Sequence, residues 1–528
     1  MRVLSALALA VGLAAGVEQT TSFDLIVSGG LVVDGTGAAG RVADVGIRDG
    51  RVVVIGHLGR AQAAERLDAT GLVVAPGFID VHTHADGLAG RPLADNYVRM
   101  GVTTIVAGNC GGSAVDVGEA FATVRAARPA VNFATLVGHN SVRTAVMGRE
   151  RRAPTLPELD RMKALVFKAM ADGALGFSTG LQYIPGAYAE TPEIVELARV
   201  AGNAGGIYAS HMRNEGTALE EAIRETLRVG ERSGARVQIS HLKVDAKSRW
   251  GASAEALRMI AEARARGIDV RADQYVYTAA SSGLAIRFPA WAMEGSRADV
   301  RARLSDAAIW ARVKREMRAL IDERGFDDLS FAIVASYAGD ASLAGLSMAD
   351  VAERLVGARD ADAQFEAARL LMVGEAPPPS MVYHFMDEAD VERIMRDPSV
   401  AFAADGALPH PDDEGKPHPR GYGNNARVLG RYVRERGVLT VEEAVRRMTS
   451  LPADHFRMAG RGRIAPGAAA DLVVFDPATV ADRATFDMPH AYPAGIPHVI
   501  VNGEVVLRDG EATGARPGQV IARSLLDR

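Results

Sequence analysis

The middle of the chain alternates short apolar runs with amphipathic helical stretches, and this alternation limits the possible folds more than any other feature. Eight runs have the length and composition of buried parallel strands: 77–81, 102–107, 131–137, 174–177, 206–209, 236–239, 268–271 and 400–403. Helical stretches separate most of them, such as 156–171, 194–204 and 218–233. Eight strand–helix units are the number that a (β/α)8 barrel requires. The pattern predicts an α/β fold whose main part, residues 76–457, is a TIM-like barrel.

The seventh and eighth runs lie much farther apart in the sequence than the others. The interval between 271 and 400 is several times longer than one crossover helix needs. We expect residues 283–345 to form an inserted subdomain over the mouth of the barrel.

Both ends of the chain have the pattern of short strands separated by glycine turns. Runs at 24–27, 31–33 and 52–55 are matched near the C-terminus by 471–475 and 499–506. We therefore predict a small β-sandwich domain built from both termini, residues 22–75 and 458–525.

Residues 1–16 have the features of a secretory signal peptide. Arg2 precedes an apolar stretch that ends in small residues and is followed by polar residues 18–21. The stretch is shorter than the roughly 20 residues that span a bilayer. Cleavage near Gly16 predicts a secreted or periplasmic protein; an uncleaved anchor is the alternative.

Charge and cysteine content exclude several classes of protein. The 60 basic and 65 acidic residues give a net charge of −5, with no long run of either sign. A binder of nucleic acid that relies on bulk positive charge is therefore not expected. The single cysteine, Cys110, excludes an intramolecular disulfide. The expected partner is a small-molecule substrate, with no membrane after signal cleavage and no particular oligomeric state predicted.

Residues that bind metals or move protons follow many of the strand-like runs. They are His82, His84, Cys110, His211, His241 and Asp405. The carboxyl ends of barrel strands converge on one site, and the two side chains of a His-x-His pair point to the same face. Taken singly, each residue has a structural explanation as a packed or hydrogen-bonded side chain. Together they predict a metal site of histidine and thiolate ligands, with Asp405 as a catalytic carboxylate.

Several motifs resemble a known family. Residues 76–86, Pro-Gly-Phe-Ile-Asp-Val-His-Thr-His-Ala-Asp, resemble the first metal motif of the amidohydrolase superfamily. The motifs around Cys110, His211 and His241, together with 176–181 and 418–423, resemble its N-acyl-D-amino-acid deacylase (D-aminoacylase) branch. Residues 464–473 are similar to the return of the superfamily's chain to its β-domain.

The resemblance implies one or two Zn²⁺ ions per subunit and a role for each motif residue. His82 and His84 would hold one metal position and His211 and His241 the other. Cys110 would bridge them, in the place that a carboxylated lysine takes in many relatives, and Asp405 would be the general base. The substrate, and its carboxylate in particular, would be held by Lys243, Tyr275, Arg420 and Ser281. The acidic stretch 411–414 and Val276 depart from the family's usual pattern.

The chemistry of these residues is that of amide hydrolysis. Bound Zn²⁺ lowers the pKa of its water to about 7 and polarises a carbonyl, and a carboxylate can carry the water proton to the leaving amine. The expected activity is zinc-dependent hydrolysis of N-acyl-D-amino acids, and L-Xaa-D-Xaa dipeptides are a second substrate class open to the same site. Cyclic-amide hydrolysis of the dihydroorotase or hydantoinase type and a non-catalytic binding barrel are the alternatives. Two environments are open for Arg287 in the expected insertion: contact with an acidic side chain of the substrate, or exposure to solvent.

Overall fold

The computed structural model describes residues 22–523. The expected signal peptide, residues 1–16, lies outside this part of the chain and stays a prediction. Within the described residues, no helix is both long enough and apolar enough to cross a membrane.

Parallel strands form the centre of the molecule, and each of the eight expected runs contains one. The first three pair in the order β6-β7-β8, and the others follow in the order β9-β10-β11-β12-β13-β17. Only Leu136 separates β8 from β9. The strands are β6 (Phe78–Asp80), β7 (Val102–Ala107), β8 (Asn132–Thr135), β9 (Val137–Gly138), β10 (Gly176–Gly180), β11 (Ile207–His211), β12 (Arg236–Ile239), β13 (Val270–Gln274) and β17 (Val400–Phe402).

The first and last of these strands also meet. An isolated parallel bridge joins Thr83 to Gly406. The Asp405 N–H donates to the His82 carbonyl at 2.9 Å, and the His84 N–H donates to the Gly406 carbonyl at 2.7 Å. The two ends of the series are thereby fixed against each other where the chain leaves both strands.

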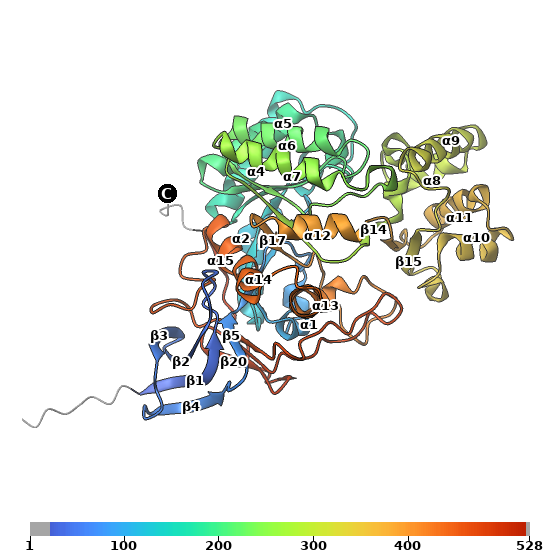
Figure 1. The fold of residues 1–528 in the computed structure, drawn as a ribbon. Helices are drawn as coiled ribbons and strands as arrows, with labels where there is room; N and C mark the ends of the chain where they lie inside the picture. Colours follow the sequence, from blue (N-terminus) through green and yellow to red (C-terminus); the bar gives the residue numbers. More distant parts are fainter. Residues whose placement is uncertain (1–21, 524–528) are drawn as a thin grey trace, which may run out of the picture.

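Helices follow most of the parallel strands, and α4–α7 lie side by side along one side of the molecule (Figure 1). Helix α6 buries Leu219, Ile223 and Leu227, which recur at helical spacing. The helices of this part are α1 (Asp95–Arg99), α2 (Val117–Ala127), α3 (His139–Met147), α4 (Leu156–Ala171), α5 (Thr191–Asn203), α6 (Leu219–Ser233), α7 (Ser253–Ala265), α12 (Glu388–Arg396), α13 (Arg420–Arg427), α14 (Val441–Met448) and α15 (Ser450–His455).

Strands from both ends of the chain share one nine-stranded sheet. Its order is β21-β20-β19-β18-β5-β1-β2-β3, with β4 on β1, and β5 pairs antiparallel with β18. These strands lie together at one end of the molecule in Figure 1. They are β1 (Phe23–Val32), β2 (Arg41–Arg48), β3 (Arg51–Gly56), β4 (Ala63–Asp68), β5 (Val73–Pro76), β18 (Leu472–Phe475), β19 (His498–Val501), β20 (Glu504–Arg508) and β21 (Glu511–Ala512).

The insertion between β13 and β17 is larger than expected. It contains the sheet β14-β16-β15 and forms a lobe beside the main body (Figure 1). The expected end at residue 345 is too early, because β16 is the central strand that pairs with both others. The elements of the lobe are β14 (Ala280–Gly283), α8 (Arg297–Ser305), α9 (Ala307–Glu323), β15 (Ala332–Ser336), α10 (Met348–Val356), α11 (Ala361–Val373) and β16 (Ser380–Tyr383).

Candidate active site

Three potential metal ligands meet at the carboxyl ends of the strands. Cys110 follows β7, His211 ends β11, and His241 follows β12. The Cys110 Sγ lies 3.6 Å from His211 Nδ1 and 3.5 Å from His241 Nε2, and the two nitrogens are 2.8 Å apart. All three side chains are buried.

The donor set fits zinc. In a tetrahedral site with Zn–S of about 2.3 Å and Zn–N of about 2.0–2.1 Å, sulfur and nitrogen ligands stand about 3.6 Å apart. The two S···N distances match this value. A soft thiolate together with imidazoles favours zinc over magnesium or calcium, which take oxygen ligands.

Buried carboxylates orient the imidazoles. Glu215 Oε1 lies 3.0 Å from His241 Nδ1, and Asp273 Oδ1 lies 3.2 Å from His82 Nδ1. At His82, a proton on Nδ1 would leave the Nε2 lone pair free for a metal, as metal-binding histidines usually require. At His241, Lys243 Nζ lies 2.7 Å from the same Nδ1, so Glu215 and Lys243 both contact this nitrogen. The carboxylates thereby support the ligand role that the sequence pattern predicts.

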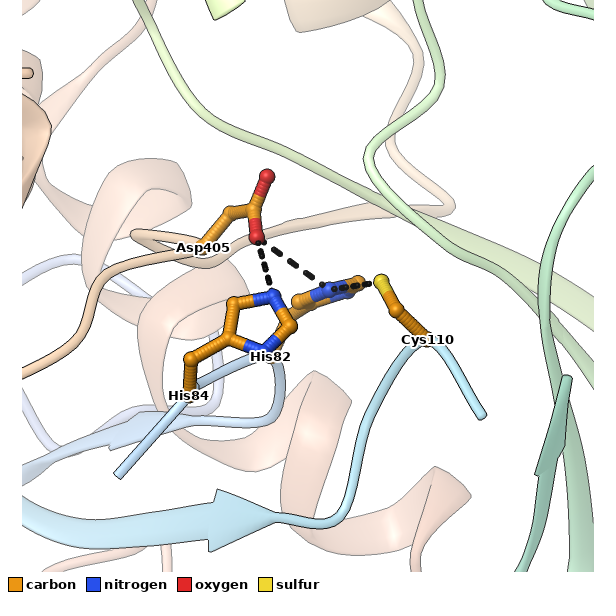
Figure 2. A group of neighbouring side chains, drawn as sticks. All are labelled: His82, His84, Cys110 and Asp405. Atoms are coloured by element: carbon orange, nitrogen blue, oxygen red, sulfur yellow. Dashed lines mark hydrogen bonds and ion pairs between the residues drawn. The ribbon is translucent and has the colours of Figure 1, made fainter. Parts of the chain in front are cut away.

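A second group shares Cys110 with the first. It contains His82, His84, Cys110 and Asp405, and Figure 2 shows their side chains directed toward one another. His82 Nε2 lies 3.3 Å from the Cys110 Sγ, and Asp405 Oδ1 lies 3.0 Å from His84 Nε2. One sulfur atom therefore adjoins two candidate metal positions.

Three of these residues have unusual backbone conformations. Cys110, His241 and Asp405 have φ of 53°, 35° and 50°, a region that non-glycine residues rarely occupy. Such conformations cost free energy and cluster at functional sites. Gly111, beside Cys110, also has a positive φ, and a Cβ there would stand 2.3 Å from the Asn140 side chain. The local backbone is thus shaped to present these side chains.

Electrostatics favours the charged forms of the thiol and the carboxyl. Burial disfavours both charged forms, but neighbouring groups outweigh it. His82 and hydrogen bonds from His211 and His241 hold the pKa of the Cys110 thiol well below its ordinary value. Arg420 and His82 hold the pKa of Asp405 well below its ordinary value. A thiolate ligand and a carboxylate able to accept a proton are therefore present at neutral pH.

Comparison with known proteins identifies the family. The model described as "Amidohydrolase family" matches residues 65–507, and the model of the urease alpha-subunit N-terminal domain matches residues 6–78. The chain belongs to the amidohydrolase family. This confirms the resemblance seen in the sequence motifs.

This amidohydrolase is similar along nearly its whole length to proteins with named activities. It is 40% identical to an N-acyl-D-glutamate deacylase of Alcaligenes xylosoxydans xylosoxydans, over 95% of this chain and 96% of the relative. It is 39% identical to a D-aminoacylase of the same organism, over 96% and 99%. The crystal structure of N-acyl-D-glutamate deacylase from Bordetella bronchiseptica, in complex with zinc and a phosphonate inhibitor, matches with a TM-score of 0.81 and 38% identity, over 95% of this chain and all of that chain.

The predicted substrate-binding residues of this amidohydrolase line one cavity of about 280 Å³. Lys243, Tyr275, Ser281 and Arg420 all contribute to its wall, as do His84 and Asp405. The Arg420 guanidinium lies 4.5 Å from the centre of the Tyr275 ring, and Lys243 Nζ lies 5.7 Å from it. Two cations thus flank one phenol at the edge of the metal ligands.

Each of these cations already has a carboxylate partner. Lys243 Nζ donates to Glu215 Oε2 at 2.8 Å, and Arg420 Nη1 forms an ion pair with Asp405 Oδ2 at 2.9 Å. Burial holds the pKa of Tyr275 well above its ordinary value, so its hydroxyl stays a hydrogen-bond donor. The cations are fixed in place by these contacts while the phenol remains neutral.

The sequence pattern assigns no role to three residues at the site, namely Glu215, Tyr183 and Asp273. Glu215 lies in the motif around His211, and it contacts both His241 and Lys243. The Tyr183 ring lies 4.6 Å from the His211 ring, and Asp273 approaches His82. Arg287, for which the sequence leaves two environments open, is only 7% exposed and lines the cavity. Of these, Tyr183 and Asp273 follow strand-like runs, a signal that could have marked them.

Proposed function

We propose that this amidohydrolase uses zinc to remove the acyl group from N-acyl-D-amino acids. The observation that carries the proposal is the buried Cys110 thiolate shared by two histidine pairs. The names of its relatives, deacylases of D-amino acids, agree with it. Cyclic-amide hydrolysis is disfavoured because β10 ends in Ser178, Thr179 and Gly180 and offers no lysine to carboxylate.

Cys110, His211 and His241 would hold the metal that serves catalysis, and His82 and His84 would complete a second position with Cys110. A zinc ion there supplies a water that ionises near neutral pH and polarises the amide carbonyl. Asp405 Oδ1 accepts the water proton and later gives it to the leaving nitrogen. Arg420, bound to the other carboxylate oxygen, keeps Asp405 ionised and oriented.

We propose that Lys243, Tyr275 and Arg420 bind the α-carboxylate of the substrate, with Ser281 beside them. Two fixed cations and one hydroxyl would hold the carboxylate, and the metal bound by Cys110, His211 and His241 would fix the carbonyl. With both points held, only one enantiomer places its side chain toward the lobe. This arrangement supports selection for the D-configuration.

The test of this clamp compares an N-acyl-D-amino acid with its α-amide. The wild type is expected to prefer the free carboxylate strongly. Lys243→Ala should lower kcat/KM for the acid by roughly 30–1,000-fold and remove much of the preference, because a buried charged contact loses one partner. Lys247→Ala, an exposed lysine nearby, is the control and should change neither value. Equal hydrolysis of acid and amide by the wild type would show that no clamp exists.

The proposed amino acid is D-glutamate or a similar D-amino acid with an acidic side chain. Arg287 is buried, stacks 4.7 Å from the Tyr383 ring centre, and its Nε has no hydrogen-bond partner among the described residues. Burial and the nearby Arg324 lower its pKa, the direction expected for a cation without a paired anion. A substrate carboxylate would supply that anion.

N-acetyl-D-glutamate and N-acetyl-D-glutamine test this assignment because they differ in one side-chain charge. We expect the wild type to favour glutamate by about 100-fold in kcat/KM, and Arg287→Met to treat the two alike. Arg301→Met, an arginine on the outside of the same lobe, serves as the control. A wild type that favours the glutamine compound would refute the role of Arg287.

We propose three further features. The parallel strands, with β8 and β9 counted as one, close into one (β/α)8 barrel, which the bridge between Thr83 and Gly406 supports. Residues 22–75 and 458–525 form one β-domain, and 76–457 the catalytic domain, as the shared nine-stranded sheet suggests. The protein is exported through the signal peptide at residues 1–16, for which the sequence pattern is the support.

A further inference from the structure

A second cavity, of about 350 Å³, lies beside the active site. We call it the side cavity. Its apolar wall consists of Ile184, Ile286, Phe288, Met293, Val300 and Met372. These residues come from the loop after β10 and from the lobe between β13 and β17.

The side cavity adjoins the active-site cavity. Gln182, Tyr183 and Ile286 line both and so form the boundary between them. Gln182 Nε2 is buried at this boundary without a hydrogen-bond partner among the described residues, and it can donate to a polar group of a bound molecule. A substrate chain that passes these three side chains enters the side cavity.

The lining suits an apolar chain. Met293, Phe288 and Met372 are almost completely buried in the free protein, and none of the described residues that line the cavity is acidic. Arg297, one of its two arginines, donates to the carbonyls of Gly374 and Ala376 and so belongs to the wall. Burial of an apolar chain against these side chains is favourable because it removes apolar surface from water.

The position of the side cavity indicates which part of the substrate enters it. The two arginines that would hold the substrate carboxylates stack on aromatic rings: Arg420 on Tyr275, and Arg287 on Tyr383. Tyr183 lies against the His211 ring, whereas Tyr275 lies nearer the His241 ring. The acyl carbon chain starts at the carbonyl that the metal would hold, and Tyr183 separates this point from the side cavity.

We propose that the side cavity binds the acyl chain of the substrate, so that the protein acts on D-amino acids that carry medium-length fatty acyl groups. This inference rests on the proposed deacylase function. On the order of ten chain carbons would fill the volume, at roughly 30 Å³ for each, the share of a water molecule in the liquid. Acetyl groups would leave the cavity empty.

The experiment measures kcat/KM for N-acetyl-, N-butanoyl-, N-hexanoyl-, N-octanoyl- and N-dodecanoyl-D-glutamate with the full chain loaded with zinc. Burial of each methylene should raise kcat/KM by about two- to fourfold, and the octanoyl compound, which is six methylenes longer, should exceed the acetyl compound by roughly 60- to 4,000-fold. The rise should stop once the chain is longer than the cavity.

Cavity-filling variants test the location. Met293→Trp and, independently, Val300→Phe should remove most of the octanoyl preference and leave N-acetyl-D-glutamate hydrolysis within about threefold of wild type, since neither residue lines the active-site cavity. Met293→Leu, which conserves volume, should keep the preference. Melting temperatures of all three variants establish that they fold.

The outcomes separate the inference from the function on which it rests. Hydrolysis of N-acetyl-D-glutamate with no gain from longer chains would overturn the inference alone. An octanoyl preference that survives in both Met293→Trp and Val300→Phe would also overturn it. So would a wild-type preference for N-acetyl-D-leucine or N-acetyl-D-methionine that these variants lose, because the side cavity would then bind the amino-acid side chain. Failure to hydrolyse any N-acyl-D-glutamate would overturn the deacylase function and the inference together.

Discussion

Asp405→Asn is expected to lower kcat by about 10²–10⁴-fold, the usual contribution of a general base. Asparagine keeps the shape of the side chain and an oxygen facing Arg420, but it cannot accept the water proton. Because the candidate metal ligands Cys110, His211 and His241 remain, zinc content and KM should change little. Single-turnover rates and zinc content per chain, measured together, separate a loss of chemistry from a loss of metal.

The matched control is Asp412→Asn. This side chain is almost fully exposed on the same loop, and the same substitution there should leave kcat unchanged. Raising the pH should not rescue Asp405→Asn, because the amide gains no basic form. Near-normal kcat in Asp405→Asn would exclude this carboxylate as the base.

Residues at strand ends could be predicted from the sequence because two simple regularities place them. The apolar runs locate the strands, and the convergence of parallel strand ends locates the residues that follow. These two regularities are enough to place His82, His211, His241 and Asp405 near one another. The family resemblance assigns Cys110 to the position between the histidine pairs, and the structure brings its sulfur within 3.6 Å of three of the histidines.

The contacts that fix the side chains around the candidate metal ligands could not be predicted from strand periodicity or from the convergence of strand ends. Glu215 lies in a loop after β11, and it meets Lys243 across 28 positions of the sequence. Arg287 is buried because Tyr383 and Phe385 cover it, and both lie nearly one hundred residues later. Contacts of this kind depend on the packing of the lobe, and neither helical nor strand periodicity records them.

The lobe itself shows the limit of local patterns. Its central strand β16 follows two helices after β15, so the sheet is completed by a segment far from its other strands. The expected boundary at residue 345 leaves α10, α11 and β16 outside the insertion. The pairing of β14 with β16 depends on tertiary contacts, which override the local signal.

Cys110→Ala is expected to lose most of the tightly bound zinc and nearly all activity. The Cys110 Sγ belongs to both groups of candidate ligands. Its removal leaves His211 and His241 as two neutral ligands in one group, and His82, His84 and Asp405 in the other. Removal of the thiolate also takes away a negative charge that the neighbouring buried imidazoles stabilise. Zinc per chain after dialysis against a weak chelator, and activity before and after added zinc, are the measurements.

A second substitution at the same position distinguishes a ligand from a packing residue. Cys110→Asp restores a negative ligand atom and should retain more zinc than Cys110→Val, which has similar bulk to cysteine but no donor. A packing role predicts the reverse order, because valine fills the buried site and a carboxylate does not. Full zinc content in Cys110→Ala would exclude the sulfur as a ligand, and with it the shared thiolate on which the deacylase assignment depends.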